Sequence, residues 1–173
     1  MKKFAILTLI TFLFGCQTTN HENAQISENE FLVKQHNNTS LIIGGVETVY
    51  VPPFEIPFQA RIDTGAETSS IDAKNIHPFE RDGEKWVSFD ITNRKTSKTI
   101  HFEKPVVRKT NIVRTLKGEK RYVVHFDITM GDEIIDTEFT LNDRSKFEYQ
   151  VLIGRNILNG RFIVDSSIEN TLH

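Results

Sequence analysis

The chain has few residues that could cross-link it or bind a metal through sulfur, because its 173 residues include one cysteine, Cys16. No internal disulfide can form, so a hydrophobic core must hold the fold. There is no His-Glu-x-x-His motif, and His77, His101 and His125 lack ligand spacing, so the sequence predicts no metal and no cofactor. The formal net charge is -2 without a basic stripe, which predicts no nucleic-acid partner.

Long helical patterns are also lacking. From Leu41 onward, short apolar runs with a period of two alternate with Gly, Pro, Asn and Asp, a pattern typical of strands and turns. One short helix is expected around Ile157 and Leu158. The sequence therefore predicts one all-β domain over residues 41–173. Its expected strands cover residues 46–51, 58–62, 86–92, 100–102, 112–115, 121–128, 135–141 and 151–153.

The first residues have the layout of a bacterial secretory leader. Lys2 and Lys3 precede an apolar run that is too short to span a bilayer. This run ends at Cys16 in Leu-Phe-Gly-Cys, which resembles the lipobox of bacterial lipoproteins, whose cysteine is lipidated. Residues 1–15 are therefore expected to be a lipoprotein signal peptide, and the polar residues 16–40 a flexible tether.

The resemblance to lipoproteins also implies a localisation. Cys16 would be the lipid anchor to the membrane, and Gln17 after it favours the outer membrane over the inner one. The domain is then expected at the bacterial cell envelope, facing the periplasm.

Residues 63–66, with the sequence Asp-Thr-Gly-Ala, are a candidate catalytic turn. In the preceding run, Phe58, Ala60 and Ile62 share one face, which predicts a strand that leads the Asp63 carboxylate into a tight turn. The tripeptide Asp-Thr-Gly is short enough that roughly one chain in tens of this length has it by chance. A second signal is needed before it indicates catalysis.

That second signal lies near the end of the domain. The apolar residues 151–153 lead into Gly154-Arg155-Asn156, followed by two aliphatic residues. The two motifs, in this order and separation, resemble retropepsin-like aspartic proteases. The wider stretch from Val46 to Asp165 is similar to the bacterial branch of that superfamily labelled ATP-dependent zinc proteases. This similarity is carried by residues 61–70, 143–145 and 152–165.

The resemblance implies a fold and a reaction. The fold would be a retropepsin-like (acid protease) closed β-barrel with one short C-terminal helix and a flap hairpin. The protein would be an aspartic-type endopeptidase, a hydrolase in which Asp63 activates water to cleave a peptide or protein substrate. Because the chain has one Asp-Thr-Gly, the second carboxylate must come from another chain. A homodimer with an Asp63/Asp63′ dyad is therefore implied.

The resemblance also assigns supporting roles around the dyad. The Thr64 hydroxyl would bond across the dimer axis, and Gly65, followed by Ala66, would let backbone approach the substrate closely. Glu67 and Arg155 would form an ion pair.

A β-hairpin is the candidate flap over the substrate. Its tip comprises Leu116, Lys117, Gly118 and Glu119. A plain surface hairpin is the alternative, because charged tips containing glycine are common in hairpins. Asp165 lacks a Thr-Gly turn and is interpreted as structural rather than catalytic.

Two functions of different class remain open. In the first, the chain is a membrane-tethered homodimeric aspartic endopeptidase. In the second, it keeps the retropepsin fold but is a non-catalytic peptide-binding or assembly module at the cell envelope, because a fold does not guarantee its chemistry. The intact Asp-Thr-Gly-Ala favours the first, since a binding module has no need of paired carboxylates that repel each other.

Overall fold

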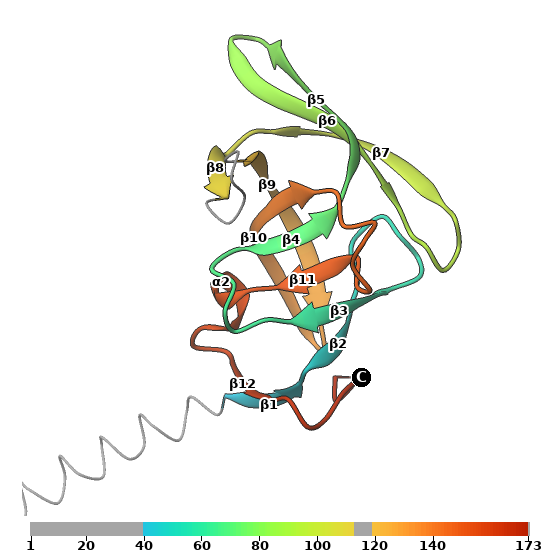
Figure 1. Cartoon of the computed structure of the whole chain (residues 1–173), viewed down its shortest axis with the longest axis vertical. Coiled ribbons are helices and arrows are strands. Elements are labelled where there is room, and N and C mark those ends of the chain that lie inside the picture. Colours follow the sequence, from blue (N-terminus) through green and yellow to red (C-terminus); the bar gives the residue numbers. More distant parts are fainter. Residues whose placement is uncertain (1–39, 113–118, 173) are drawn as a thin grey trace, which may run out of the picture. The chain divides into compact units, whose positions relative to one another are not determined.

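The computed structural model describes residues 40–112 and 119–172. Strands are the main secondary structure of these residues, with one helix of a single turn (Figure 1). The predicted all-β class and the short helix after residue 154 are confirmed. In chain order the elements are β1 (Leu41–Gly44), β2 (Val46–Val49), β3 (Phe58–Ile62), β4 (Ser69–Asp72), β5 (Lys74–Arg81), β6 (Glu84–Thr92), β7 (Thr99–Pro105), β8 (Arg108–Ile112), β9 (Glu119–Met130), β10 (Glu133–Asn142), β11 (Val151–Ile153), α2 (Arg155–Leu158) and β12 (Phe162–Asp165).

The described strands form three sheets. The largest has the order β2-β3-β11-β4-β10-β9-β8, β5 to β7 form a second, and β1 pairs with β12. After β2, Tyr50 and Thr129 exchange two backbone hydrogen bonds of 3.0 and 2.9 Å, so the large sheet curls back on itself. This contact is a single bridge, and the sheets are not closed into a barrel. The prediction of a closed barrel is wrong in this respect.

The central position of β11 determines where the two sequence motifs lie. This strand pairs in parallel with β3 and antiparallel with β4. Val151 and Ile153 are fully buried, as expected for a short apolar strand inside a sheet. Because β3 and β11 run in the same direction, the residues that follow each strand emerge at the same edge of the sheet.

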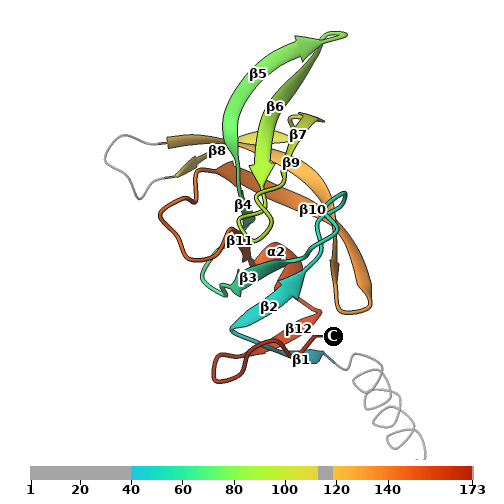
Figure 2. The ribbon, with the colours of Figure 1, turned by 90° about the vertical axis from the view of Figure 1, so that its right-hand side faces the viewer.

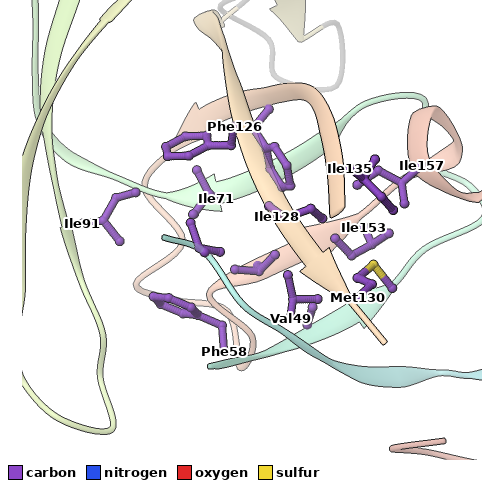
Figure 3. Packing of buried hydrophobic residues seen from close by; sticks show 14 of the residues in the cluster. Val49, Phe58, Ile71, Ile91, Phe126, Ile128, Met130, Ile135, Ile153 and Ile157 are labelled. Atoms are coloured by element: carbon purple, nitrogen blue, oxygen red, sulfur yellow. The ribbon is translucent and has the colours of Figure 1, made fainter. Parts of the chain in front are cut away.

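Buried side chains from most of the strands pack into one core (Figure 3). In β3, burial alternates and Phe58, Ala60 and Ile62 face the core, as the period of two predicted. The aromatic rings in this core lie 5.5 to 6.1 Å apart between centroids, in stacked and edge-to-face arrangements that are favourable for rings. They belong to Phe89, Phe102, Phe126 and Phe139.

The predicted hairpin between Trp86 and Phe102 is confirmed as β6 and β7. Val87, Phe89 and Ile91 of β6 are buried in the core. The third strand of this sheet, β5, was not predicted, because most of its side chains are exposed and leave no apolar alternation. Figure 1 and Figure 2 both place this sheet at the opposite end of the domain from β1 and β12.

The hairpin proposed as a flap is present as β8 and β9, which pair from Arg108 opposite Val123 to Ile112 opposite Glu119. Its first arm begins earlier than predicted. The expected tip residues Leu116, Lys117 and Gly118 lie outside the described residues, and Glu119 is the first residue of β9. The flap role therefore stays a prediction.

The predicted signal peptide (1–15), Cys16 and all of the predicted tether except Ser40 also lie outside the described residues. Within residues 40–112 and 119–172, no helix has the length and apolar character that a membrane span requires.

A buried carboxylate joins the two ends of the domain. Glu47 of β2 is fully buried, and its carboxylate accepts hydrogen bonds from the Gly44 amide at 2.6 Å and the Leu172 amide at 3.1 Å. It also accepts bonds from the Thr171 amide, at 3.0 and 3.1 Å, and from the Thr171 hydroxyl at 2.7 Å. Burial by itself raises the pKa of Glu47, but these hydrogen bonds outweigh it and hold the pKa below its ordinary value.

Candidate functional site

The Asp63 turn (residues 63–66) follows β3 directly, as predicted. The Asp63 amide donates to the Ile153 carbonyl at 2.9 Å, which fixes the start of the turn to β11. The Asp63 carboxylate accepts a hydrogen bond from the Gly65 amide at 2.9 Å through Oδ1. Asp63 is partly buried, whereas Thr64 and Gly65 are exposed. The turn thus presents a carboxylate and accessible backbone at the edge of the sheet.

Arg155 holds this turn from the other motif. Its amide donates to the Ala66 carbonyl at 2.9 Å, and its Nη1 donates to the carbonyls of Thr64 and Gly65, each at 3.0 Å. The predicted ion pair between Arg155 and Glu67 is absent from the described part of the chain, because the guanidinium is turned toward the backbone of the turn instead. Arg155 therefore positions the turn and leaves the Glu67 side chain exposed.

The Asn156 side chain makes four hydrogen bonds at this site, and the sequence analysis assigned it no role. Its Oδ1 accepts hydrogen bonds from the amide and the hydroxyl of Ser69, at 2.9 and 2.8 Å. Its Nδ2 donates to the Thr137 hydroxyl and to the Glu138 carbonyl, both at 2.9 Å. One amide side chain thus links α2, the start of β4 and β10. The only sign of this role in the sequence was the position of Asn156 in the motif Gly154-Arg155-Asn156.

Gly154 lets the two motifs approach each other. A Cβ atom at this position would lie 2.9 Å from the Thr68 carbonyl carbon and 3.0 Å from the Ala66 oxygen, closer than real Cβ contacts allow. The Gly154 amide donates to the Ser69 hydroxyl at 3.0 Å. The structure therefore brings Gly154 and Arg155 against the Asp63 turn, as the pairing of motifs predicted.

The face of β4 that points away from the core carries a second group of polar residues. Asp72 accepts hydrogen bonds from Nη2 of Arg94 and from the Arg144 amide, both at 2.7 Å. The same Nη2 of Arg94 donates to the Arg144 carbonyl at 2.7 Å. Asp72 and Arg144 are 7% and 6% exposed. Both oxygens of this buried carboxylate are therefore engaged.

The Arg144 guanidinium lies within this group. Its Nε donates to the Tyr149 carbonyl at 3.0 Å, and its central carbon lies 4.7 Å from the centroid of the Phe147 ring. Burial lowers the pKa of Arg144, the negative charge of Asp72 opposes this, and the positive charges of Arg121 and Arg94 add to the lowering. The side chains of Arg94, Arg144 and Asp72 thus bring charges of both signs together here.

Arg108 connects the β8–β9 hairpin to the site. Its Nε donates to Oε2 of Glu138 in β10 at 2.9 Å, and its Nη2 forms an ion pair with the same oxygen at 2.7 Å. Its Nη2 also donates to the Thr68 hydroxyl at 3.3 Å, in the segment between the Asp63 turn and β4. No sequence spacing pointed to Arg108, because its partners are distant along the chain.

A pocket of about 240 Å³ is lined in part by Arg94, and no residue of the Asp63 turn contributes to it. It lies between the loop before β3, the turn after β6 and the loop before β11, and Phe58, Arg94 and Tyr149 contribute to its lining.

Asp165, the second carboxylate weighed in the sequence, is structural as interpreted. Its Oδ1 accepts hydrogen bonds from the amide and hydroxyl of Ser167, at 2.9 and 2.6 Å.

The dyad between two Asp63 residues and the bond from Thr64 to a partner involve a second chain. They stay predictions.

A solved structure shares this architecture. It is a crystal structure from Legionella pneumophila of a protein of unknown function, Lpg0085 (DUF785). The two are 28% identical with a TM-score of 0.66, and the similarity covers 77% of this chain and 98% of that one.

Curated relatives carry a different kind of name. "Probable alpha-L-glutamate ligase" is the name of a protein from Shewanella pealeana that is 38% identical over 76% of this chain. Proteins of the same name come from Desulfotalea psychrophila, at 36% identity over 76% of this chain, and Parasynechococcus marenigrum, at 38% over 72%. The chain spans 30%, 29% and 28% of the length of these three relatives.

These names contradict the predicted activity. A ligase forms a bond, whereas the sequence predicted a membrane-tethered homodimeric aspartic endopeptidase, a hydrolase that breaks one. By this comparison, the prediction of a hydrolase that acts through Asp63 and the Asp63 of a second chain is wrong. The predicted description of the chain as an aspartyl protease is wrong for the same reason. The error came from taking two motifs and a resemblance in fold as sufficient for the chemistry, which a shared fold does not guarantee.

The family relationship itself is confirmed. Residues 42–172 match the RimB-like family, which is described as the retropepsin-like aspartic endopeptidase RimB. The match covers the described domain from the second residue of β1 to Leu172, including both motifs. The chain therefore belongs to the RimB-like family of retropepsin-like proteins.

Proposed function

We propose that the domain recognises α-linked glutamyl peptides and works together with an α-L-glutamate ligase. This proposal develops the second function left open by the sequence, a retropepsin-fold module that binds peptide. In this proposal the ligase forms the bonds, and this domain recognises the peptide chain that carries the glutamates.

The relatives support the partnership. Their names refer to ligation of α-L-glutamate, and the region similar to this chain is under one third of each. A domain that forms a minor part of a ligase is well placed to select the chain on which the ligase acts. A peptide of linked glutamates carries one carboxylate per residue, so its recognition requires clustered cations.

The observation that carries the proposal is the pair of arginines at Asp72 of β4, Arg94 and Arg144. Arg94 donates to the Asp72 carboxylate, and the Arg144 guanidinium also interacts with that carboxylate's charge, so two cations accompany one anion. Guanidinium groups bind carboxylates in a planar, two-pronged arrangement and are preferred for this purpose. The exposed backbone of the Asp63 turn offers hydrogen-bonding groups to the main chain of the peptide.

The test is a direct binding measurement with the full chain. Synthetic capped α-linked pentaglutamate is titrated by calorimetry at pH 7, with pentaglutamine of the same length as the uncharged control. We expect pentaglutamate to bind and its affinity to fall with added salt, because charged groups make the contact. Equal affinity for the two peptides, or no binding of either, would contradict the proposal.

The homodimer and the Cys16 lipid anchor stay predictions that neither the described residues nor the relatives test. Recognition of a glutamyl peptide requires neither.

A further inference from the structure

Apolar side chains are exposed together at one end of the domain, on the sheet formed by β1 and β12. Ile42 of β1 is 54% exposed and Ile163 of β12 is 56% exposed. The two residues lie opposite each other in the register of the parallel strands, so their side chains project from the same face, about 5 Å apart. Single exposed apolar residues are ordinary on a protein surface, whereas neighbouring ones indicate a contact.

A third isoleucine lies beside these two. Gly44 is two residues after Ile42 on β1, so a Cβ atom added to it would project from the same face. That atom would lie 2.4 Å from the Ile168 carbonyl oxygen and 2.7 Å from the Glu169 Cα. The segment after β12 therefore crosses this face next to Ile42. Ile168 is itself 38% exposed, and we call Ile42, Ile163 and Ile168 the isoleucine patch.

The two faces of the β1–β12 sheet differ in their cover. Parallel strands occur almost only in sheets whose two faces are both covered. On the inner face Ile43 of β1 is fully buried in the core, and partly buried residues of β12 pack against that core. On the outer face Ile42 and Ile163 stay exposed. Within the described domain, the outer face of this parallel pair is therefore incompletely covered.

Both ends of the described domain lie at the isoleucine patch. β1 is the first strand, and the last described residues return to the segment that follows it. The Gly45 amide donates to the Ile168 carbonyl, and the Asn170 amide donates to the Val46 carbonyl, both at 2.8 Å. Figure 1 and Figure 2 both show the end of the chain beside β1 and β12. A polypeptide that continues from either end of such a domain therefore starts next to the patch.

The relatives named as ligases contain such a continuation. In the Shewanella pealeana relative the similarity spans 135 residues, about the size of the family match over residues 42–172. That region is 30% of the relative's length, so more than two thirds of the relative lies outside it. The remainder is attached at one end of the similar domain or at both. Because both ends lie at the patch, the remainder of the relative begins beside the corresponding surface.

We propose that the isoleucine patch is the surface on which this domain docks against the α-L-glutamate ligase. This inference rests on the proposed function and names the contact through which the two work together. Covering the exposed isoleucines removes apolar area from water, as at the centre of other interfaces. The Ile62 amide, one residue before Asp63, donates to the Gly45 carbonyl at 3.0 Å. A ligase docked on the patch is therefore close to the Asp63 turn, where the peptide is held.

The experiment titrates the full chain with the part of the Shewanella pealeana relative that lies outside the similar region. A cooperative thermal transition first shows that this part is folded. We expect the natural chain to bind it. Ile42→Ser and Ile163→Ser should each weaken binding about 10-fold, because each removes an apolar side chain that the interface buries.

Val107→Ser is the matched control. Val107 is 44% exposed and follows β7, whose sheet lies at the opposite end of the domain from β1 and β12 (Figure 1). This variant should change the affinity for the ligase part less than about twofold. All three variants should keep the melting temperature within about 3 °C of the natural chain, since exposed side chains contribute little to stability.

A second measurement applies if the ligase part does not fold alone. Residues 41–172 of this chain then replace the similar region of the complete relative. We expect amide hydrogen exchange in β1 and β12 to be slower in this fusion than in the free chain, because the docked ligase covers both strands. Ile42→Ser with Ile163→Ser should restore the faster exchange. Equal exchange in the fusion and the free chain would overturn the inference.

Failure of this inference differs from failure of the proposed function. Pentaglutamate is titrated into the same variants and should bind unchanged, because Arg94 and Arg144 are intact. If the natural chain binds pentaglutamate but not the ligase part, or if the isoleucine variants bind that part equally well, the docking surface is wrong and peptide recognition stands. If the natural chain does not bind pentaglutamate, peptide recognition itself is wrong.

Two other occupants of the patch are also tested. Sedimentation that shows a dimer of the natural chain and a monomer of Ile163→Ser would assign the patch to a second copy of this chain. Weaker pentaglutamate binding by Ile42→Ser and Ile163→Ser would assign it to the peptide. Either result would overturn docking of the ligase at the patch.

Discussion

Asn156 Oδ1 accepts two hydrogen bonds from one residue, the amide of Ser69 at 2.9 Å and its hydroxyl at 2.8 Å. The Ser69 hydroxyl in turn accepts a bond from the Gly154 amide at 3.0 Å. The motif after β11 and the start of β4 are thereby joined in a closed ring of polar contacts. This ring fixes α2 against the start of β4.

Asn156→Ala should destabilise the domain by about 1–3 kcal/mol, because it leaves the Ser69 amide and the Thr137 hydroxyl without their partner. Asn156→Asp keeps the acceptor for Ser69 but loses the donor to the Glu138 carbonyl, so it should be destabilised through that end only. Urea unfolding measures both free energies. A loss below about 0.5 kcal/mol in Asn156→Ala would show that the ring adds little to stability.

Gly154→Ala should disturb the site more than an alanine at another glycine. The added Cβ would meet backbone at 2.9 and 3.0 Å, so the turn or the helix must shift, at a cost of about 1–3 kcal/mol. Gly45→Ala is the control, since its Cβ would lie at an ordinary 3.6 Å from the nearest atoms. Thermal unfolding of both variants provides the comparison, and similar losses in the two would contradict a tight approach at Gly154.

Glu47→Gln should lower the free energy of unfolding by about 1–3 kcal/mol at pH 7, because the carboxylate accepts bonds from the Gly44, Thr171 and Leu172 amides. The pKa of Glu47 is lowered in the folded state from its ordinary value of 4.5. Its contribution is therefore complete above about pH 4.5 and is lost as the pH falls through the lower folded pKa.

The measurement for Glu47 is denaturant unfolding of both proteins from pH 7 to pH 3. The difference between them should be constant at neutral pH and shrink below about pH 4.5. A difference that grows on acidification would mean that the folded state raises this pKa instead.

Arg108→Gln should loosen the β8–β9 hairpin without unfolding the domain. The lost contacts with Glu138 and Thr68 are partly exposed, so we expect less than about 1 kcal/mol in global stability. Amide hydrogen exchange should quicken in β8 but not in β11, which lies inside the sheet. Lys85→Gln in β6 is a control for the loss of one charge. Unchanged exchange in β8 would show that Arg108 does not restrain the hairpin.

Strands with one buried face could be predicted from the sequence. In β3 the alternation of Phe58, Ala60 and Ile62 matches the burial in the structure. By contrast, β5 has no buried face to produce such an alternation, and every residue of β4 is buried whether apolar or polar. A period of two appears in the sequence only when the two faces of a strand differ.

The site was predicted in part, for a similar reason. The Asp63 turn and Gly154 were found because backbone constraints restrict the residue types at these positions. A carboxylate and a glycine follow the strand at the turn, and Gly154 lies where the backbones approach closely. Arg108 was not found, and Arg144 was noted only within residues 143–145 of the family resemblance, because the contacts of both depend on partners that only the folded chain brings near. Asn156 was within a known motif, but its four hydrogen bonds could not be inferred from spacing.

Glu47 also has a consequence for synthesis of the chain. Its partner Thr171 is made 124 residues later, which at about 5–20 residues per second takes about 6–25 s. During that time β2 has been made, but the carboxylate has not received its donors from Thr171 and Leu172, and β1 has not received its partner β12. The nascent domain must therefore wait with an unpaired strand edge at its beginning, the condition in which chains associate wrongly or recruit chaperones.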